Sequence, residues 1–217
     1  MIELERISPV VFKNRPVKTE NRDNWEVVME YSTEGDGPYL VDLSHKLRFD
    51  LQDEDLAARQ PFGISLPETP GGSVLGNGIL ANRMNQSQVS LYNLTNEDNS
   101  TIVGEPGITD VTEATLFVAL IGKNIFSICE KLTALDFMEP TRNAPFLFQG
   151  PFSHVPCQIV TLDKEGNTTG LVLTCSRGYG EDMIHSILQA GEEFGLKPAG
   201  EDKFTAWINS LESMILS

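Results

Sequence analysis

The order of the predicted elements in the second half of the chain places the strongest constraint on its fold. Residues 108–122, ITDVTEATLFVALIG, have the composition of a strand, and residues 123–135 carry apolar side chains at helical spacing. Two further apolar runs, 157–163 and 169–176, flank the turn sequence KEGNT and predict a β-hairpin. Residues 181–195 return to helical spacing and end on a glycine. The order strand, helix, strand, strand, helix is typical of an α+β fold.

The first half shows a weaker version of the same order. Residues 24–32 predict a strand, and residues 39–52 predict a half-buried strand because apolar and polar residues alternate from Leu43 onward. Residues 53–60 combine an acidic start with good helix formers and predict a short helix. Residues 79–94 predict two strands on either side of NQSQ.

A short pattern also occurs in both halves. VDLSHKLRFDL and TDVTEATLFVA each contain an aspartate, a hydroxyl residue two positions later and a phenylalanine seven positions later. Asp42 and Asp110, which begin the two patterns, are expected to accept hydrogen bonds from their own backbone in turns. The two halves together predict two ferredoxin-like-type modules packed side by side, each an antiparallel sheet with helices on one face.

The polar segment 95–107, TNEDNSTIVGEPG, is the best internal boundary. We therefore predict an N-terminal arm and first strand (1–38), a first α+β module (39–107), a second α+β module (108–200) and a C-terminal helix (201–217).

Residues 136–156 predict a long, proline-rich loop. Phenylalanines in this loop and in the preceding helix form either a satellite core or a docking face. Exposure of the rings as one patch would favour the docking face. The five rings are Phe126, Phe137, Phe146, Phe148 and Phe152.

Charge and composition narrow the range of functions. The 217 residues carry a formal net charge of −15 that is spread along the chain, and such a surface repels nucleic-acid phosphates. No apolar run approaches the roughly 20 residues of a bilayer span, and the N-terminus has no basic segment followed by an apolar one. We expect a cytoplasmic protein that binds neither nucleic acid nor membrane. The widely spaced Cys129, Cys157 and Cys175 predict buried free thiols rather than a zinc site.

Motifs for bound cofactors are missing from the sequence. It contains no G-x-x-x-x-G-K-[ST], and no G-x-G-x-x-G follows a strand, so we expect this chain to bind neither FAD nor NAD itself. His45, His154 and His185 are scattered, with neither a Ser/His/Asp order nor metal-ligand spacing. His154, between prolines, could line a pocket or a partner surface. No metal is therefore expected.

Several segments resemble the gamma subunit of heterotetrameric sarcosine oxidase. ITDVTEATLFVALIGKNIFSICEKLTALDF (108–137) is similar to a stretch in which a DVS-type turn starts a strand, a glycine ends it and a helix follows. FLFQGPFSHVPCQIV (146–160) and LRFDLQDEDLAARQPFGISLPETPGG (47–72), with its GISLP core, also resemble that family. The resemblance covers residues 39–198 and rests on the order and spacing of many short motifs.

That subunit is related to the folate-binding aminomethyltransferase fold of the glycine cleavage T-protein, so the resemblance implies a T-protein-like fold. In T-protein-like enzymes an R-T-G-Y-T-G-E turn carries an acid that can hold the folate pteridine. Here the turn is R-G-Y-G-E, from Arg177 to Glu181; it is shorter than the family's turn, and DMIHSIL replaces the family's G-F-E. The family's catalytic aspartate follows an N-x-x-N segment, which places Asp98 as the positional candidate. The residues after Asp98 cannot form a good amphipathic helix, so we expect no catalytic residue.

Three residues of the turn are the candidate folate contacts. Glu181 could bind the amino and ring N–H groups of a pterin, or it could stabilise the first helical turn as an acid at a helix N-terminus. Arg177 could clamp a carboxylate such as a glutamyl tail, or it could be a surface arginine at a strand end. Tyr179 could stack on a flat ring or fill the turn.

The resemblance implies a non-catalytic accessory subunit of a sarcosine oxidase-like complex. Such a subunit would dock on a larger flavoprotein subunit in N-methyl amine oxidation, with the one-carbon unit passing to tetrahydrofolate. The alternative is a stand-alone folate-dependent aminomethyltransferase or demethylase that grips tetrahydrofolate near Glu181 and Arg177. A third hypothesis is a homo-oligomer that keeps the fold without partner or ligand.

Overall fold

The computed structural model describes residues 5–95, 105–165 and 169–215, with side chains as far as Leu211. The largest sheet has six strands, and all its pairs are antiparallel except that of β13 with β3. In spatial order these strands are β10 (Phe146–Phe152), β11 (Val155–Asp163), β12 (Gly170–Ser176), β9 (Thr115–Ile121), β3 (Tyr39–Asp42) and β13 (Lys197–Ala199).

A second, fully antiparallel sheet has five strands, and two more strands form a separate hairpin. The five are β5 (Ser73–Gly76), β6 (Ile79–Arg83), β7 (Gln88–Asn93), β4 (Arg48–Gln52) and β8 (Ile108–Asp110). The hairpin strands are β1 (Pro16–Arg22) and β2 (Trp25–Tyr31).

Three α-helices and several 3-10 turns complete the described structure. The helices are α1 (Ile125–Cys129), α2 (Gly180–Gly191) and α3 (Glu201–Ile215). The 3-10 turns are η1 (Leu56–Ala58), η2 (Pro61–Gly63), η4 (Thr112–Ala114), η5 (Arg177–Tyr179) and η6 (Glu192–Phe194).

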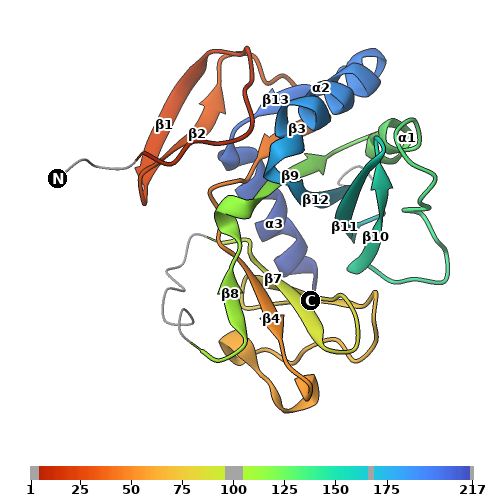
Figure 1. The fold of residues 1–217 in the computed structure, drawn as a ribbon. Helices are drawn as coiled ribbons and strands as arrows, with labels where there is room; N and C mark the ends of the chain where they lie inside the picture. Colours follow the sequence, from red (N-terminus) through yellow and green to blue (C-terminus); the bar gives the residue numbers. More distant parts are fainter. Residues whose placement is uncertain (1–4, 96–104, 166–168, 216–217) are drawn as a thin grey trace.

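The six-stranded sheet is buried on both faces, and β9 shows why. Its side chains alternate between two cores, with Leu116 and Leu120 in one and Phe117 and Ile121 in the other. The first core packs against α1 and α2, and the second against α3 and residues of the five-stranded sheet. In Figure 1, α3 runs through the middle of the molecule and the five-stranded sheet lies below it. A strand buried on both faces has a continuous apolar run, as LFVALI does.

The α+β class with antiparallel sheets is confirmed, as are the hairpin of β11 and β12 and the strand pair around NQSQ. The helical spacing from residue 181 forms α2 and η6, and Gly195 follows with a left-handed φ of 73°. The helix predicted at residues 53–60 was wrong, because the structure has only the 3-10 turn η1 in this segment. There Asp53 accepts the Asp55 backbone N–H and forms an ion pair with Arg59, which holds a tight turn ahead of Pro61.

Two predicted strands are each divided between the sheets. The segment 39–52 forms β3 in the six-stranded sheet and β4 in the five-stranded sheet, and 108–122 forms β8 and β9 in the reverse order. Asp42 accepts the Ser44 backbone N–H at 2.9 Å, and Asp110 accepts the Thr112 backbone N–H at 2.8 Å. These turns interrupt the strands, and we call them the two exchange turns. The predicted division at residue 107 therefore separates β8 from the sheet that it joins.

The predicted loop 136–156 was wrong over its second half, because residues 146–152 form β10. This strand lies at the edge of the sheet. Pro151 has no backbone N–H to donate, and an edge strand tolerates this because only one of its sides is paired. Phe137, Phe146 and Phe152 are buried, and Phe148 packs edge-on against two of the rings with centroid distances of 5.6 and 5.9 Å. The rings form part of the core rather than an exposed patch.

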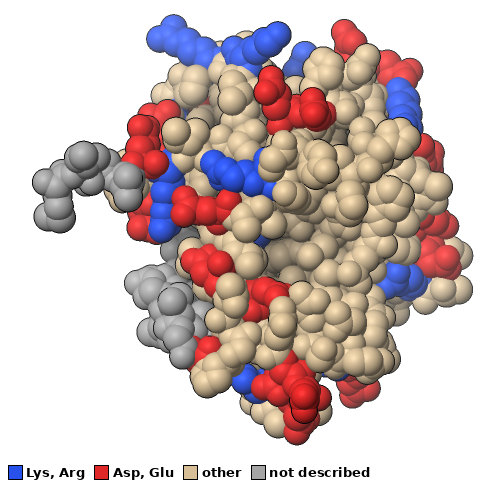
Figure 2. Space-filling view, in the orientation of Figure 1, with Lys and Arg blue, Asp and Glu red and all other residues tan. Residues whose placement is uncertain are grey.

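The predicted extended arm also contains a strand, because β1 pairs with β2 across the turn Asp23–Asn24. Both turn residues have positive φ, 48° and 64°, which is the geometry of a tight hairpin turn. On the surface, Figure 2 shows acidic side chains in separate groups with lysines and arginines between them. Among the described residues, none of the helices combines the length and the apolar character that crossing a bilayer requires.

Candidate functional site

The turn from β12 into α2 carries the three residues predicted to contact folate. η5 follows β12 directly, and α2 begins at Gly180. Glu181 is exposed in the first turn of α2, Tyr179 is 47% exposed, and Arg177 is partly buried. An acid in this position is favoured by the helix dipole.

The N-terminal segment, residues 7–14, lies across this turn. Arg177 Nη2 donates a hydrogen bond to the carbonyl of Ile7. A Cβ at Gly180 would lie 2.7 Å from Cβ and 2.8 Å from the carbonyl oxygen of Pro9, so only glycine permits this approach. At Gly178 an added Cβ would meet nothing within 4 Å. The second glycine of GYG therefore serves packing of the chain against itself.

A groove between the N-terminal segment and α2 is the space that Glu181 faces. Its volume is about 450 Å³, within the usual range for a small-molecule site. Ionisable side chains border it from both sides, and apolar side chains supply the remainder. Glu181 borders the groove, whereas Arg177 and Tyr179 do not, so the three candidates do not converge on one space. The lining residues are Val11, Lys13, Asn14, Glu181, Asp182, Ile184, His185, Leu188 and Pro198.

The other predicted acids separate into two groups. Asp42 and Asp110 hold the exchange turns, as their positions predicted, and Asp42 also accepts the Ser8 hydroxyl at 2.6 Å. Asp98 lies outside the described residues. His154 follows Ser153 in the turn between β10 and β11, where both have positive φ. Within the described ranges, no group of three or more His, Cys, Asp or Glu side chains is arranged to hold a metal ion.

Sequence reasoning missed a buried charge cluster at the start of α3. Glu201 is 0% exposed, and its carboxylate lies 2.6 Å from Lys46 Nζ and 3.3 Å from His45 Nε2. Arg22, at the end of β1, also pairs with this carboxylate. The cluster joins the N-terminal hairpin, the turn between β3 and β4, and α3. In the sequence, Glu201 is only an acid in the first turn of a predicted helix. The helix dipole is sufficient to explain an acid there, so nothing in the sequence indicates a buried cluster.

The charges of this cluster shift one another's pKa values. Burial alone would raise the pKa of Glu201, but His45 and the charge of Lys46 outweigh it and hold the pKa far below its usual range. Burial lowers the pKa of Lys46, while the Glu201 carboxylate opposes that change. Glu201 is therefore ionised in the folded protein at neutral pH.

The stability that Glu201 contributes should be lost at low pH. A carboxyl group whose pKa is depressed by folding binds protons more readily when unfolded, so its contribution is present above the unfolded pKa of about 4.3 and is lost as pH falls further. Urea unfolding of the parent and of Glu201→Gln between pH 7 and pH 3 measures this contribution. We expect a constant difference in unfolding free energy down to about pH 5, and a shrinking one below. A difference that stays constant to pH 3 would contradict the assignment.

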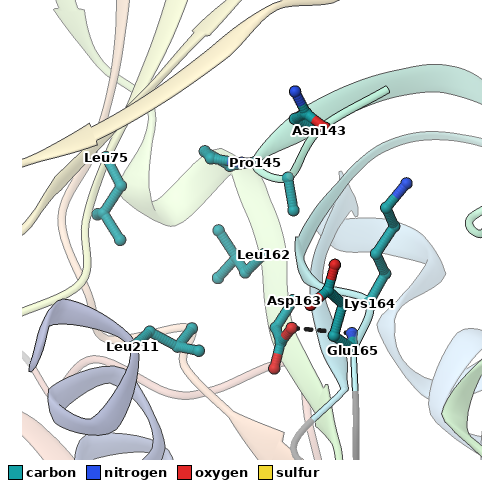
Figure 3. Close-up of a pocket in the computed structure, with 9 residues that line it drawn as sticks. Leu75, Asn143, Pro145, Leu162, Asp163, Lys164, Glu165 and Leu211 are labelled. Carbon is teal, nitrogen blue, oxygen red and sulfur yellow. Dashed lines mark hydrogen bonds between the residues drawn. The ribbon is translucent and has the colours of Figure 1, made fainter. Parts of the chain in front are cut away.

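A second cavity lies where the two sheets and α3 meet, away from all predicted site residues. It measures about 280 Å³, and Figure 3 shows Leu75, Leu162 and Leu211 around its apolar part. Lys164 Nζ donates to the carbonyls of Glu139 and Arg142 at 2.9 and 2.6 Å, so this cation holds the 139–142 loop in place. The described lining of the cavity is more apolar than polar, and Asn143, Asp163, Lys164 and Glu165 supply its polar part.

Comparison with known proteins gives a likeness of fold. The sequence matches no protein-family model and, at a significant level, no curated protein. Among solved structures, the chain is similar to one chain of the heterotetrameric sarcosine oxidase from Corynebacterium sp. U-96, solved in complex with pyrrole 2-carboxylate. The TM-score is 0.60 at 14% sequence identity, and the match covers 71% of this chain and 84% of that one. The likeness establishes a shared fold across most of both chains.

Proposed function

We propose that this chain is a non-catalytic accessory subunit of a sarcosine oxidase-like complex, docked on a larger flavoprotein subunit that oxidises an N-methyl amine. The observation that carries the proposal is the fold likeness to a chain of a heterotetrameric sarcosine oxidase, which spans 84% of that chain. The role in folate-linked one-carbon metabolism follows from the same proposal. It requires no catalytic residue in this chain.

The N-terminal surface is the docking face that we propose. The described residues include six exposed large hydrophobic side chains, and three of them, Ile7, Val11 and Tyr179, belong to the N-terminal segment or to η5, which that segment contacts. Their exposed fractions are 67%, 80% and 47%. Exposed apolar side chains on contacting segments are candidates for a protein interface.

Co-expression with the larger flavin-containing subunits of a sarcosine oxidase-like complex tests the proposal. We expect co-elution with flavin absorbance in size-exclusion chromatography, and at least about tenfold weaker association for the double variant Ile7→Asp/Val11→Asp, because burying two carboxylates costs several kcal/mol. Val74→Asp is the matched control, since Val74 is 37% exposed on β5, in the other sheet. Elution of the parent chain apart from the flavoprotein would overturn the proposal, and equal weakening by Val74→Asp would exclude this docking face.

The alternative, a folate-dependent aminomethyltransferase or demethylase, draws support from the groove that Glu181 borders. Calorimetric titration with tetrahydrofolate distinguishes the two functions. Binding that Glu181→Gln abolishes and that Glu192→Gln, a change farther along the same helical segment, leaves intact would favour the enzyme. An absence of binding at millimolar ligand supports the accessory subunit. A stable homodimer that ignores both flavoprotein and folate would favour self-association.

A further inference from the structure

Two cysteines lie directly opposite each other on neighbouring strands. Cys157 of β11 and Cys175 of β12 are register partners in an antiparallel pair. Directly opposed residues in such a pair point to the same face of the sheet. Both side chains belong to the core between the sheet and α2, and both are free thiols. Cys129 belongs to the same core but lies in α1, away from this register.

The register brings the two residues within reach of a disulfide. Opposed residues in antiparallel strands have Cα atoms about 4.5–5.5 Å apart, and a disulfide accepts about 4.4–6.8 Å. Their Cβ atoms lie about 4.5–5.5 Å apart, and a disulfide needs about 3.5–4.5 Å, so a closure of roughly 1 Å suffices. No change of register or of strand direction is required.

The pair also lies near the ends of its strands. Cys175 is followed by the exposed Ser176, the last residue of β12, and Cys157 is preceded by the exposed Pro156 near the start of β11. Each thiol is only 5% exposed, but strand ends open more readily than strand centres. A small oxidant can therefore reach the pair through local opening, whereas Cys129 is 0% exposed.

We infer that Cys157 and Cys175 form a redox modification site, at which a hydroperoxide such as H₂O₂ converts the two thiols into a cross-strand disulfide. The inference does not depend on the proposed function. The interaction between the thiols favours ionisation of Cys175, because the contact with Cys157 lowers the pKa of Cys175 against the effect of burial. The same contact, together with burial, raises the pKa of Cys157.

The reaction balances with one peroxide for each disulfide. The Cys175 thiolate attacks one peroxide oxygen, the O–O bond breaks, and the hydroxide that leaves takes up a proton to form water. The Cys157 sulfur then attacks the resulting sulfenic acid at sulfur. An S–S bond forms, the S–O bond breaks, and the hydroxyl group of the sulfenic acid leaves as water after it takes up the Cys157 proton. The sulfurs together lose two electrons, which reduce the peroxide.

Peroxide treatment of the full-length chain, followed by alkylation and mass spectrometry, tests the inference. We expect a disulfide between the peptides that contain Cys157 and Cys175, a mass lower by two hydrogen atoms, and reversal by dithiothreitol. Cys129 should still be a free thiol when the alkylating agent is added, because its buried thiol has a raised pKa and stays protonated. During peroxide treatment, the free thiol of Cys129 should disappear at least about tenfold more slowly than the thiols of Cys157 and Cys175.

A cysteine variant and two results that would contradict the inference complete the test. In Cys157→Ser the remaining Cys175 has no partner, so peroxide should add oxygen to it without forming an intramolecular disulfide. Equal alkylation of all three cysteines after peroxide treatment of the parent would overturn the inference. A disulfide that includes Cys129 would do the same. Both results are read from the unmodified sequence, so they do not require that any variant folds.

Discussion

Replacing Glu201 by glutamine is expected to lower the free energy of unfolding by about 3–5 kcal/mol, the usual result of removing one partner from a buried ion pair. Glutamine preserves the shape of the side chain, but it leaves Lys46, which is 3% exposed, without its anion. His45 and Arg22 lose the same partner. Urea denaturation at pH 7, followed by circular dichroism, measures the change.

Asp202→Asn is the matched control, because Asp202 follows Glu201 in the first turn of α3 and contributes a similar charge to the helix terminus. Its partner, Lys18, lies on the surface at 2.8 Å, and the two side chains are about half exposed. We expect a much smaller loss for this exposed pair. The double variant Lys46→Met/Glu201→Leu should recover part of the loss, since the buried Lys46 charge is removed together with its anion and Arg22 keeps its pair with Glu20. Equal losses for Glu201→Gln and Asp202→Asn would show that only the helix dipole is involved.

Replacing Arg48 by methionine is expected to cost at least about 3 kcal/mol, because each buried carbonyl left without a donor costs about 1–3 kcal/mol. Arg48 is 1% exposed, and its guanidinium donates to the carbonyl of Lys46 at 2.6 Å and to that of Thr115 at 3.0 Å. It also donates to the carbonyls of Ser44 and Thr112, one in each exchange turn. Burial lowers the pKa of Arg48 to about 10, so the group remains charged at neutral pH. Thermal and urea unfolding measure the loss.

Arg83→Met is the matched control for Arg48. Arg83 is 9% exposed and also donates to backbone carbonyls, those of Asn85 and Gln86, at 2.8 and 2.6 Å. These acceptors lie two and three residues away in one turn, whereas the Arg48 acceptors Thr112 and Thr115 lie 64 and 67 residues away. We expect Arg83→Met to cost less than half as much. A similar cost for both variants would mean that Arg48 contributes only ordinary burial of an arginine.

Local periodicity was sufficient for elements whose environment is uniform along their length. α2 buries one stripe of side chains, including Met183, Ile184 and Ile187, and its helical spacing was readable from the sequence. The strands β11 and β12 each hold an apolar run on either side of a polar turn. In these segments, the period of the sequence and the period of burial agree.

Periodicity failed where a strand changes its sheet. Apolar residues continue through Leu43 and Leu47, so the alternation of residues 39–52 gives no sign that β3 and β4 belong to different sheets. The informative signal was the aspartate followed two residues later by a hydroxyl residue, which occurs at both exchange turns. That signal marks a turn, but it does not tell which strand lies beside the chain after the turn.

The sites depended on contacts between distant segments, which a single sequence does not encode. Arg177 reaches Ile7 across 170 positions, and Glu201 meets Lys46 and His45 from the opposite end of the chain. The residues of the R-G-Y-G-E turn were located correctly at the start of a helix, but the N-terminal segment that covers them gave no sequence signal. The groove at Glu181 exists only because that segment lies beside α2.

The two exchange turns have a consequence for how the chain could have been assembled or rearranged during evolution. Because β3 lies in the sheet of the second half and β8 in the sheet of the first, each half contributes one strand to the sheet of the other half. A gene fragment that encodes either half alone would specify a sheet with one strand missing and an exposed hydrogen-bonding edge. Recombination at residue 107 would therefore exchange incomplete pieces, because each sheet needs strands from both halves.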